Sequence, residues 1–115
     1  MANTNKTKGS NYERQIRLEY RAMGWINCET SRYKSKYLDD NKIDITDTNP
    51  FSIQTKCTLK SPSYPKIFKE ILDIKGNYKL IYHKKPRDNE YVIIQKSDFH
   101  ELLDMLIKNH IIDPK

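Results

Sequence analysis

The segment Lys42–Cys57, which reads KIDITDTNPFSIQTKC, decides the fold. Apolar and polar residues alternate in two runs, 42–47 and 51–58, and this alternation is typical of β-strands. The short polar turn Asp47-Thr48-Asn49-Pro50 joins the two runs, and Asn, Asp and Pro favour tight turns. The segment therefore predicts a β-hairpin.

The predicted hairpin gathers three polar side chains. If it is symmetric about Thr48 and Asn49, Asp44 lies opposite Gln54, with Cβ atoms about 4.5–5.5 Å apart. Gln54 and Lys56 share one face of the second strand because they are two residues apart. Asp is depleted inside strands, so its presence at position 44 favours a functional role over that of an ordinary surface residue. The ordinary alternative is a polar sheet face that meets water.

A helix is predicted before the hairpin. Residues 1–9 are polar and lack periodicity, which predicts a flexible basic arm carrying Lys6 and Lys8. The capping-box pattern SNYE predicts a helix from Ser10 to about Met23, followed by a glycine. Its apolar face consists of Tyr12, Ile16, Tyr20 and Met23.

Glu13 lies beside that apolar face, one position round the helix, and can look towards a neighbouring sheet from the first turn. After the helix, 25–31 predicts a strand and 32–41 a charged loop without periodicity. A helix, the strand 25–31 and the first hairpin strand are thus predicted to precede the second hairpin strand.

The rest of the chain completes an α/β pattern. Pro65 predicts the start of a helix through Lys75, and 78–83 and 90–95 predict two apolar strands. Ser97 is predicted to cap a last helix whose apolar stripe is Phe99, Leu102, Leu103, Leu106 and Ile107. The order αβββαββα predicts an α/β fold with a mixed central sheet of about five strands flanked by helices, in one domain over 10–115.

Composition and charge narrow the function classes. With 115 residues, 31% charged and 37% apolar, the chain suits a single folded domain rather than a disordered one. No apolar run reaches membrane-spanning length, the start lacks a signal peptide, and the two cysteines show no C-x-x-C spacing. We therefore expect a cytoplasmic protein. Residues 1–37 hold eight Lys or Arg against three Glu, which suggests a polyanionic partner such as nucleic acid.

Three stretches of the chain resemble the PD-(D/E)XK nuclease superfamily: GSNYERQIRLEYRAMGW (9–25), SRYKSKYLDDNKIDI (31–45) and FSIQTKC (51–57). The family pattern is a Glu in an N-terminal helix, an Asp followed by an apolar residue, and then an acidic-x-Lys in a strand. More narrowly, the chain resembles the short, basic Holliday junction resolvases of archaea and phages. The resemblance covers the first two thirds of the chain and implies a restriction-endonuclease-like fold.

The resemblance also implies a catalytic set, which is Glu13, Asp44, Gln54 and Lys56. It implies that Mg²⁺ or Mn²⁺ is held by Asp44, Gln54, the Thr55 carbonyl oxygen and Glu13, with Lys56 orienting the attacking water. For Glu13 the alternative is the partner of Ser10 in the capping box, and for Lys56 it is an ordinary surface lysine. The implied DNA-binding residues are Arg14, Arg32, Lys34, Ser35, Lys36 and Lys60, for which a solvated charge run is the alternative.

Gln54 departs from the family pattern, which usually has Glu or Asp in this position. Gln offers a neutral carbonyl oxygen where a hard cation prefers an anionic one, so we expect a weaker metal site unless Asp40 or Asp47 supplies the charge. Some members of the superfamily carry Gln in this position.

The function that the resemblance implies is metal-dependent endonuclease cleavage of branched DNA in recombination by a homodimeric Holliday junction resolvase, in the host cytoplasm if the chain comes from a phage. The last helix is one candidate for the dimer surface, and core packing is the alternative for its stripe. Three other functions remain open: a nuclease of the same fold with another DNA substrate, a DNA-binding module with weak or no catalysis, and a small protein whose basic surface meets an acidic partner.

Overall fold

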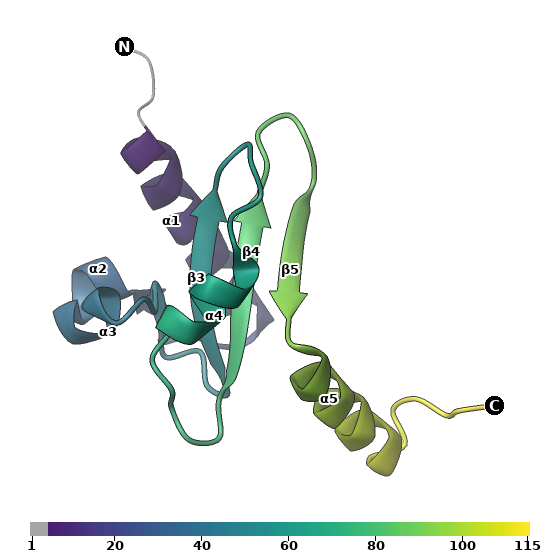
Figure 1. Cartoon of the computed structure of the whole chain (residues 1–115). Helices are drawn as coiled ribbons and strands as arrows, with labels where there is room; N and C mark the ends of the chain where they lie inside the picture. The colour runs from purple at the N-terminus through teal and green to yellow at the C-terminus, as the bar shows by residue number, and fades with distance from the viewer. Residues whose placement is uncertain (1–4) are drawn as a thin grey trace.

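A five-stranded mixed sheet forms the centre of the computed structural model, which describes residues 5–115 (Figure 1). Its strands, in their order across the sheet, are β1 (Glu29–Thr30), β2 (Ile45–Thr46), β3 (Phe51–Cys57), β4 (Tyr78–Lys84) and β5 (Glu90–Ile94). β3 and β4 are parallel, and every other neighbouring pair is antiparallel. The predicted α/β fold with a mixed sheet of five strands and flanking helices is confirmed.

The predicted hairpin is formed by β2 and β3. Ile45 pairs with Ile53, which centres the hairpin on Asn49. The turn contains a cis Asn49–Pro50 peptide bond, and the Thr48 hydroxyl donates to the Phe51 carbonyl oxygen at 2.7 Å. β2 is shorter than the predicted 42–47, because regular pairing ends at Ile45.

Helices cover both faces of the sheet. α1 (Asn5–Met23) packs on one face, where Tyr12, Ile16 and Tyr20 join Ile45 and Ile53 in a core. α4 (Tyr64–Glu70) packs on the other, where Ile67 and Phe68 join Ile43 and Ile81 in a second core. Because β3 lies in the middle of the sheet between the two cores, the side chains of 52–55 are buried on both faces, and the alternative of a sheet face that meets water is excluded there.

The predicted start of the first helix is wrong. α1 begins at Asn5, so Ser10 lies inside the helix and is not its N-cap, and 5–9 is helical instead of an arm. Residues 1–4 and the side chain of Lys6 lie outside the described part of the chain. Met23, predicted on the apolar face, is 62% exposed, although α1 ends there as predicted.

The chain between α1 and β2 also differs from the prediction. Only Glu29 and Thr30 of the predicted strand 25–31 pair with β2, since β2 offers just Thr46 and Ile45 as partners. The predicted loop 32–41 contains two short helices, α2 (Ser31–Lys34) and α3 (Lys36–Asp40). Such short helices show no periodicity in the sequence, and α3 depends on a local cap in which the Leu38 N–H donates to the Ser35 hydroxyl.

The last helix, α5 (Lys96–Lys108), extends away from the sheet (Figure 1). It begins at Lys96 after the N-cap residue Gln95, so the predicted Ser97 cap is wrong, and α4 ends at Glu70 rather than Lys75. None of the residues of α5 is buried. Core packing therefore does not account for its apolar stripe.

Candidate active site

Asp44 occupies the point where the regular pairing of β2 with β3 ends. Its backbone N–H donates to the Ile53 carbonyl oxygen at 2.8 Å. Its carboxylate oxygen Oδ2 accepts from the Thr55 N–H at 2.8 Å and from the Thr55 hydroxyl at 3.1 Å. The residue is 9% exposed, and within residues 5–115 no hydrogen bond engages Oδ1. One oxygen of a buried carboxylate is thus fixed by the strand, while the other remains available.

Glu13 projects from α1 and is 6% exposed. Because Ser10 is not a cap, the capping-box role of Glu13 is excluded, and its carboxylate pairs with the Arg32 guanidinium at 3.4 Å. Burial, together with the negative charge of Asp44, raises the pKa of Glu13 to about 7, although Arg32 opposes the shift. Near neutral pH the protonated and the ionised form of the Glu13 carboxyl group are therefore both populated.

Burial also raises the pKa of Asp44, against the two hydrogen bonds from Thr55 and the positive charge of Lys56. A third carboxylate, Asp39 of α3, raises the pKa of both Glu13 and Asp44 by its charge. Three acidic groups thus repel one another at this place, and a bound cation would relieve that repulsion.

Asp39 is the residue that the sequence prediction missed. Asp40 and Asp47 were expected to supply extra negative charge, but Asp40 pairs with Lys36 at 3.0 Å and Asp47 pairs with Lys34. The adjacent residues Asp39 and Asp40 show in the sequence that this segment carries carboxylates. The sequence alone does not show which of the two acts on Glu13 and Asp44 by its charge, because this depends on the placement of the short helix α3.

Gln54 and Lys56 lie on the α4 side of the sheet. Gln54 is level with Ile81, and Lys56 with His83, whose ring is hydrogen-bonded to Tyr64 of α4 at 2.9 Å. Thr55 is level with Tyr82 and faces α1. The predicted single cluster is therefore divided: Lys56 acts on Asp44 through its charge, whereas Gln54 makes no hydrogen bond with Asp44. Gln54 is 7% exposed, and its Oε1 has no partner among the described residues.

A pocket of about 520 Å³ opens beside Glu13, and Arg14, Arg17 and Arg32 line it. Arg32 donates to the Ser10 hydroxyl, and Arg17 pairs with Glu29 at 2.8 Å. Guanidinium groups bind phosphate by paired hydrogen bonds, so the pocket offers an anion-binding surface next to the carboxylates.

The predicted DNA-binding residues are found in different places. Arg14 and Arg32 line the pocket beside Glu13, while Lys34 and Lys36 form ion pairs in α2 and α3. Ser35 accepts a hydrogen bond as the cap of α3. Lys60 lies away from this pocket, in a groove on the other side of α1.

The donor set fits a hard cation that keeps several of its waters. In the described part of the chain, no three His, Cys, Asp or Glu side chains are close enough together to hold a metal ion. Mg²⁺, however, is usually bound by one or two carboxylates together with water and substrate phosphate. Glu13 and Asp44 supply two carboxylates, whereas the buried, unpartnered Oε1 of Gln54 lies on the α4 side of β3. The predicted Thr55 carbonyl ligand stays a prediction.

Compared with known proteins, the chain matches no family model, no curated protein and no solved structure at a significant level. The resemblance to the nuclease superfamily therefore rests on the quoted residues alone. Among the helices of residues 5–115, none combines the length and apolar character needed to cross a membrane.

Replacing Thr55 by valine tests the hydrogen bonds at Asp44. Thr55→Val keeps the shape and the backbone donor but removes the hydroxyl, so we expect the pKa of Asp44 to rise further. The acidic limb of any cleavage–pH profile should move to higher pH, and stability above that pKa should fall by about 1.5–3 kcal/mol, as for a hydrogen bond to a charged group. Urea unfolding and initial rates measure both effects. Thr55→Ser, which retains the hydroxyl, should behave like wild type, and equal profiles for all three proteins would contradict the assignment.

Proposed function

We propose that the protein is a metal-dependent endonuclease that hydrolyses phosphodiesters in branched DNA, as a Holliday junction resolvase does, in the cytoplasm. The observation that carries this proposal is the buried pair Glu13 and Asp44, whose carboxylates repel each other beside an arginine-lined pocket. Such repulsion costs folding free energy at neutral pH and is typical of functional sites.

Each residue of the site has a separate role in the proposed reaction. Asp44 and Glu13 would hold Mg²⁺ or Mn²⁺, which when bound lowers the pKa of water and polarises phosphate, and Gln54, on the α4 side of β3, is the residue whose part in the ligand set is to be tested. Arg14 and Arg32 bind the phosphate, and Lys56 stabilises the negative charge that develops on its oxygens. Thr55 holds Asp44 in place by donating two hydrogen bonds to Oδ2, and Oδ1 would therefore be the oxygen that binds the metal ion.

Cleavage of a labelled four-way junction tests the proposal directly. We expect paired cuts in Mg²⁺ or Mn²⁺ and none in EDTA, and we expect the junction to be cut in preference to a duplex of equal length. Equal cutting of both substrates would favour a nuclease with another DNA substrate. Binding without cutting in either metal would favour the DNA-binding module, which the neutral Gln54 already suggests.

Gln54→Glu measures whether Gln54 is a ligand. If its Oε1 faces the cation, the added charge should lower the Mg²⁺ concentration for half-maximal cleavage by on the order of tenfold, about 1.4 kcal/mol. A metal titration of the initial rate measures this change. An unaltered requirement would remove Gln54 from the ligand set and make Asp39 the next residue to replace. Activity that exists only in the variant would identify the wild type as a binding module.

A homodimer is part of the proposal, because two cuts in a four-way junction require two sites. An apolar hollow of about 440 Å³ lies between α1, β5 and α5, where Met23, Val92 and Phe99 are 62%, 51% and 47% exposed. Exposed apolar patches mark interfaces, so we place a second copy here.

Sedimentation should give a dimer for wild type and a monomer for Phe99→Glu. Ile26→Glu, at a residue that is 74% exposed outside the hollow, should leave the dimer intact. A wild-type monomer at high concentration would contradict this surface.

A further inference from the structure

A second basic groove lies on the other side of α1 from the pocket that contains Glu13. Ser10, Glu13, Arg14 and Arg17 of α1 line the first pocket, whereas Lys8, Asn11, Tyr12 and Gln15 line the second groove. At 3.6 residues per turn these two sets lie on roughly opposite faces of the helix, so α1 separates the first pocket from the second groove. The second groove consists of two adjoining pockets of about 230 and 530 Å³, which share Lys8, Cys57 and Pro86.

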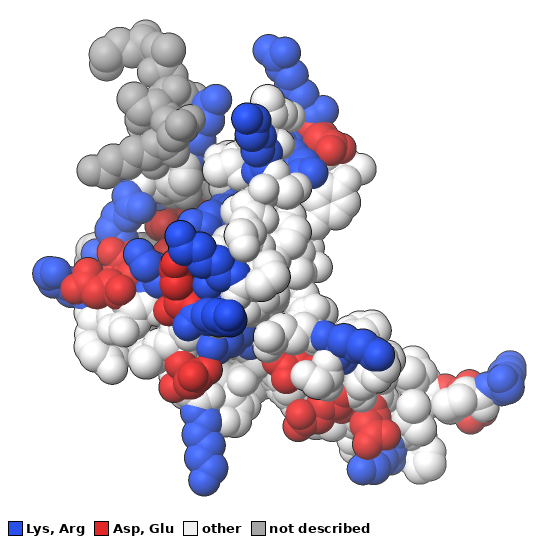
Figure 2. Space-filling view, viewed as in Figure 1, with Lys and Arg blue, Asp and Glu red and all other residues white. Residues whose placement is uncertain are grey.

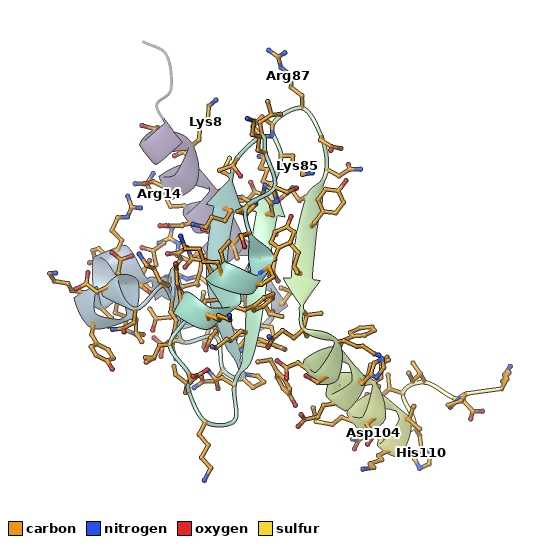
Figure 3. All side chains as sticks on the ribbon, in the orientation of Figure 1. Lys8, Arg14, Lys85, Arg87, Asp104 and His110 are labelled. Carbon is orange, nitrogen blue, oxygen red and sulfur yellow. The ribbon has the colours of Figure 1, made fainter. Side chains whose placement is uncertain are left out.

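The second groove is lined by cations, and the carboxylate at its edge is Glu90, which accepts a hydrogen bond from Gln15 at 3.3 Å. Lys8, Lys60, Lys84 and Arg87 contribute to its walls, and no Asp or Glu lines either of its two pockets. Among residues 5–115, none of these four cations forms an ion pair, whereas Arg17 and Arg32 of the first pocket do. Figure 2 shows blue side chains, with white and red ones among them, at the upper end of the molecule, where Lys8 and Arg87 lie (Figure 3). Their charge is therefore available to an external anion.

The fold holds these cations in place. The Lys84 ammonium lies 5.9 Å from the ring centroid of Tyr12, and the Lys85 ammonium lies 6.0 Å from that of Tyr91. The β4–β5 turn is closed by the Asp88 N–H, which donates to the Lys85 carbonyl oxygen at 3.0 Å. Figure 3 shows Lys8 of α1 at the same end of the molecule as Lys85 and Arg87 of this turn. The groove is thus built from a helix, a strand end and a closed turn.

We propose that this groove binds the phosphodiester backbone of a second DNA segment while the first pocket holds the segment to be cut. The proposal rests on the proposed function, since it takes DNA as the partner. β3 connects the two places, because Lys56 acts on Asp44 through its charge and the next residues, Cys57 and Thr58, line the groove. A protein that contacts two backbones on opposite sides of one helix favours a substrate in which two arms diverge. The groove therefore supplies a physical reason for preferring branched DNA to a single duplex.

Cys57 provides a probe of the groove in the unaltered protein. It is half-buried and lines both pockets, whereas Cys28 is fully buried and burial raises the pKa of its thiol, so alkylation reports on Cys57. In EDTA, an uncut junction at ten times its dissociation constant should slow alkylation roughly tenfold, because only the free protein reacts. Cys57→Ser should lose the labelling. An unchanged rate, with the junction shown to be bound in a gel, would overturn the proposal.

Charge reversal tests the groove by a second measurement. Lys60→Glu with Arg87→Glu removes two phosphate contacts, so the slope of log affinity against log salt should fall by about 2, and the preference for junction over duplex should decrease. The matched control is Lys75→Glu with Lys115→Glu, which makes the same charge change at two exposed residues outside the groove. We expect this control to keep the slope and the preference of wild type.

The two proposals fail in different ways. If wild type binds junctions in EDTA but cuts nothing with metal, the nuclease proposal fails while the groove is still tested by binding. If wild type cuts junctions and the Lys60, Arg87 double variant keeps the salt slope and the preference, the groove proposal is overturned alone. If no DNA binds at moderate salt, both are overturned.

Discussion

Asp44→Asn should reduce metal-dependent cleavage by on the order of 10³-fold, the upper range for removing one preorganised electrostatic group. Asparagine has nearly the same shape, and its carbonyl oxygen can still accept the two hydrogen bonds that Thr55 donates to Asp44 Oδ2. The variant should therefore fold normally. With Gln54 also neutral, however, two amides would face a cation that requires anionic oxygen.

Initial rates on a four-way junction across a range of Mg²⁺ concentrations measure the loss, and binding in EDTA separates it from DNA affinity. We expect junction binding to be kept, because the variant carries one negative charge fewer. The control is Asp40→Asn, which changes a carboxylate in α3 that is paired with Lys36 at 3.0 Å. Wild-type cleavage by Asp44→Asn would remove Asp44 from the active site.

Glu13→Gln should abolish most cleavage and at the same time stabilise the protein at pH 8. The pKa of Glu13 is about 7 in the folded chain and 4.5 in its ordinary state, so the folded protein binds more protons between these values. Stability from this group is present below about pH 4.5 and is lost as the pH rises through 7. Replacing the carboxylate by an amide removes that loss, which amounts to up to about 3 kcal/mol at pH 8.

Urea unfolding at pH 5 and pH 8 measures this effect. Wild type should lose stability between the two values, and Glu13→Gln should lose less. Excess Mg²⁺ should restore part of the wild-type stability at pH 8 through binding to the folded state, but it should have little effect on the variant. Glu19→Gln, an exposed change on the same helix, serves as the control. Parallel pH dependence in wild type and Glu13→Gln would show that Glu13 is not under electrostatic strain.

Local sequence patterns predicted the elements that depend on neighbouring residues. The alternation in 42–57 predicted the hairpin and the register that pairs Ile45 with Ile53, because turn chemistry and strand periodicity act over a few residues. The end of α1 at Met23 was predicted for the same reason, since Gly24 takes a positive φ that favours glycine. For the candidate site, the residue types and spacing of Glu13, Asp44 and Lys56 led to the prediction, because they resemble a known pattern, and their catalytic roles stay a prediction.

Tertiary structure decided the features that depend on residues distant in the chain. Ser10 became a partner of Arg32 instead of a cap, and Asp39 rather than its neighbour Asp40 acts on Asp44. Gln54 is buried because β3 lies between two helical layers, and α5 leaves the sheet with its apolar stripe uncovered. The second groove joins Lys8, Lys60 and Arg87 from three separate segments. Periodicity determines which side chains share a face, whereas burial and charge repulsion arise only when distant segments pack together.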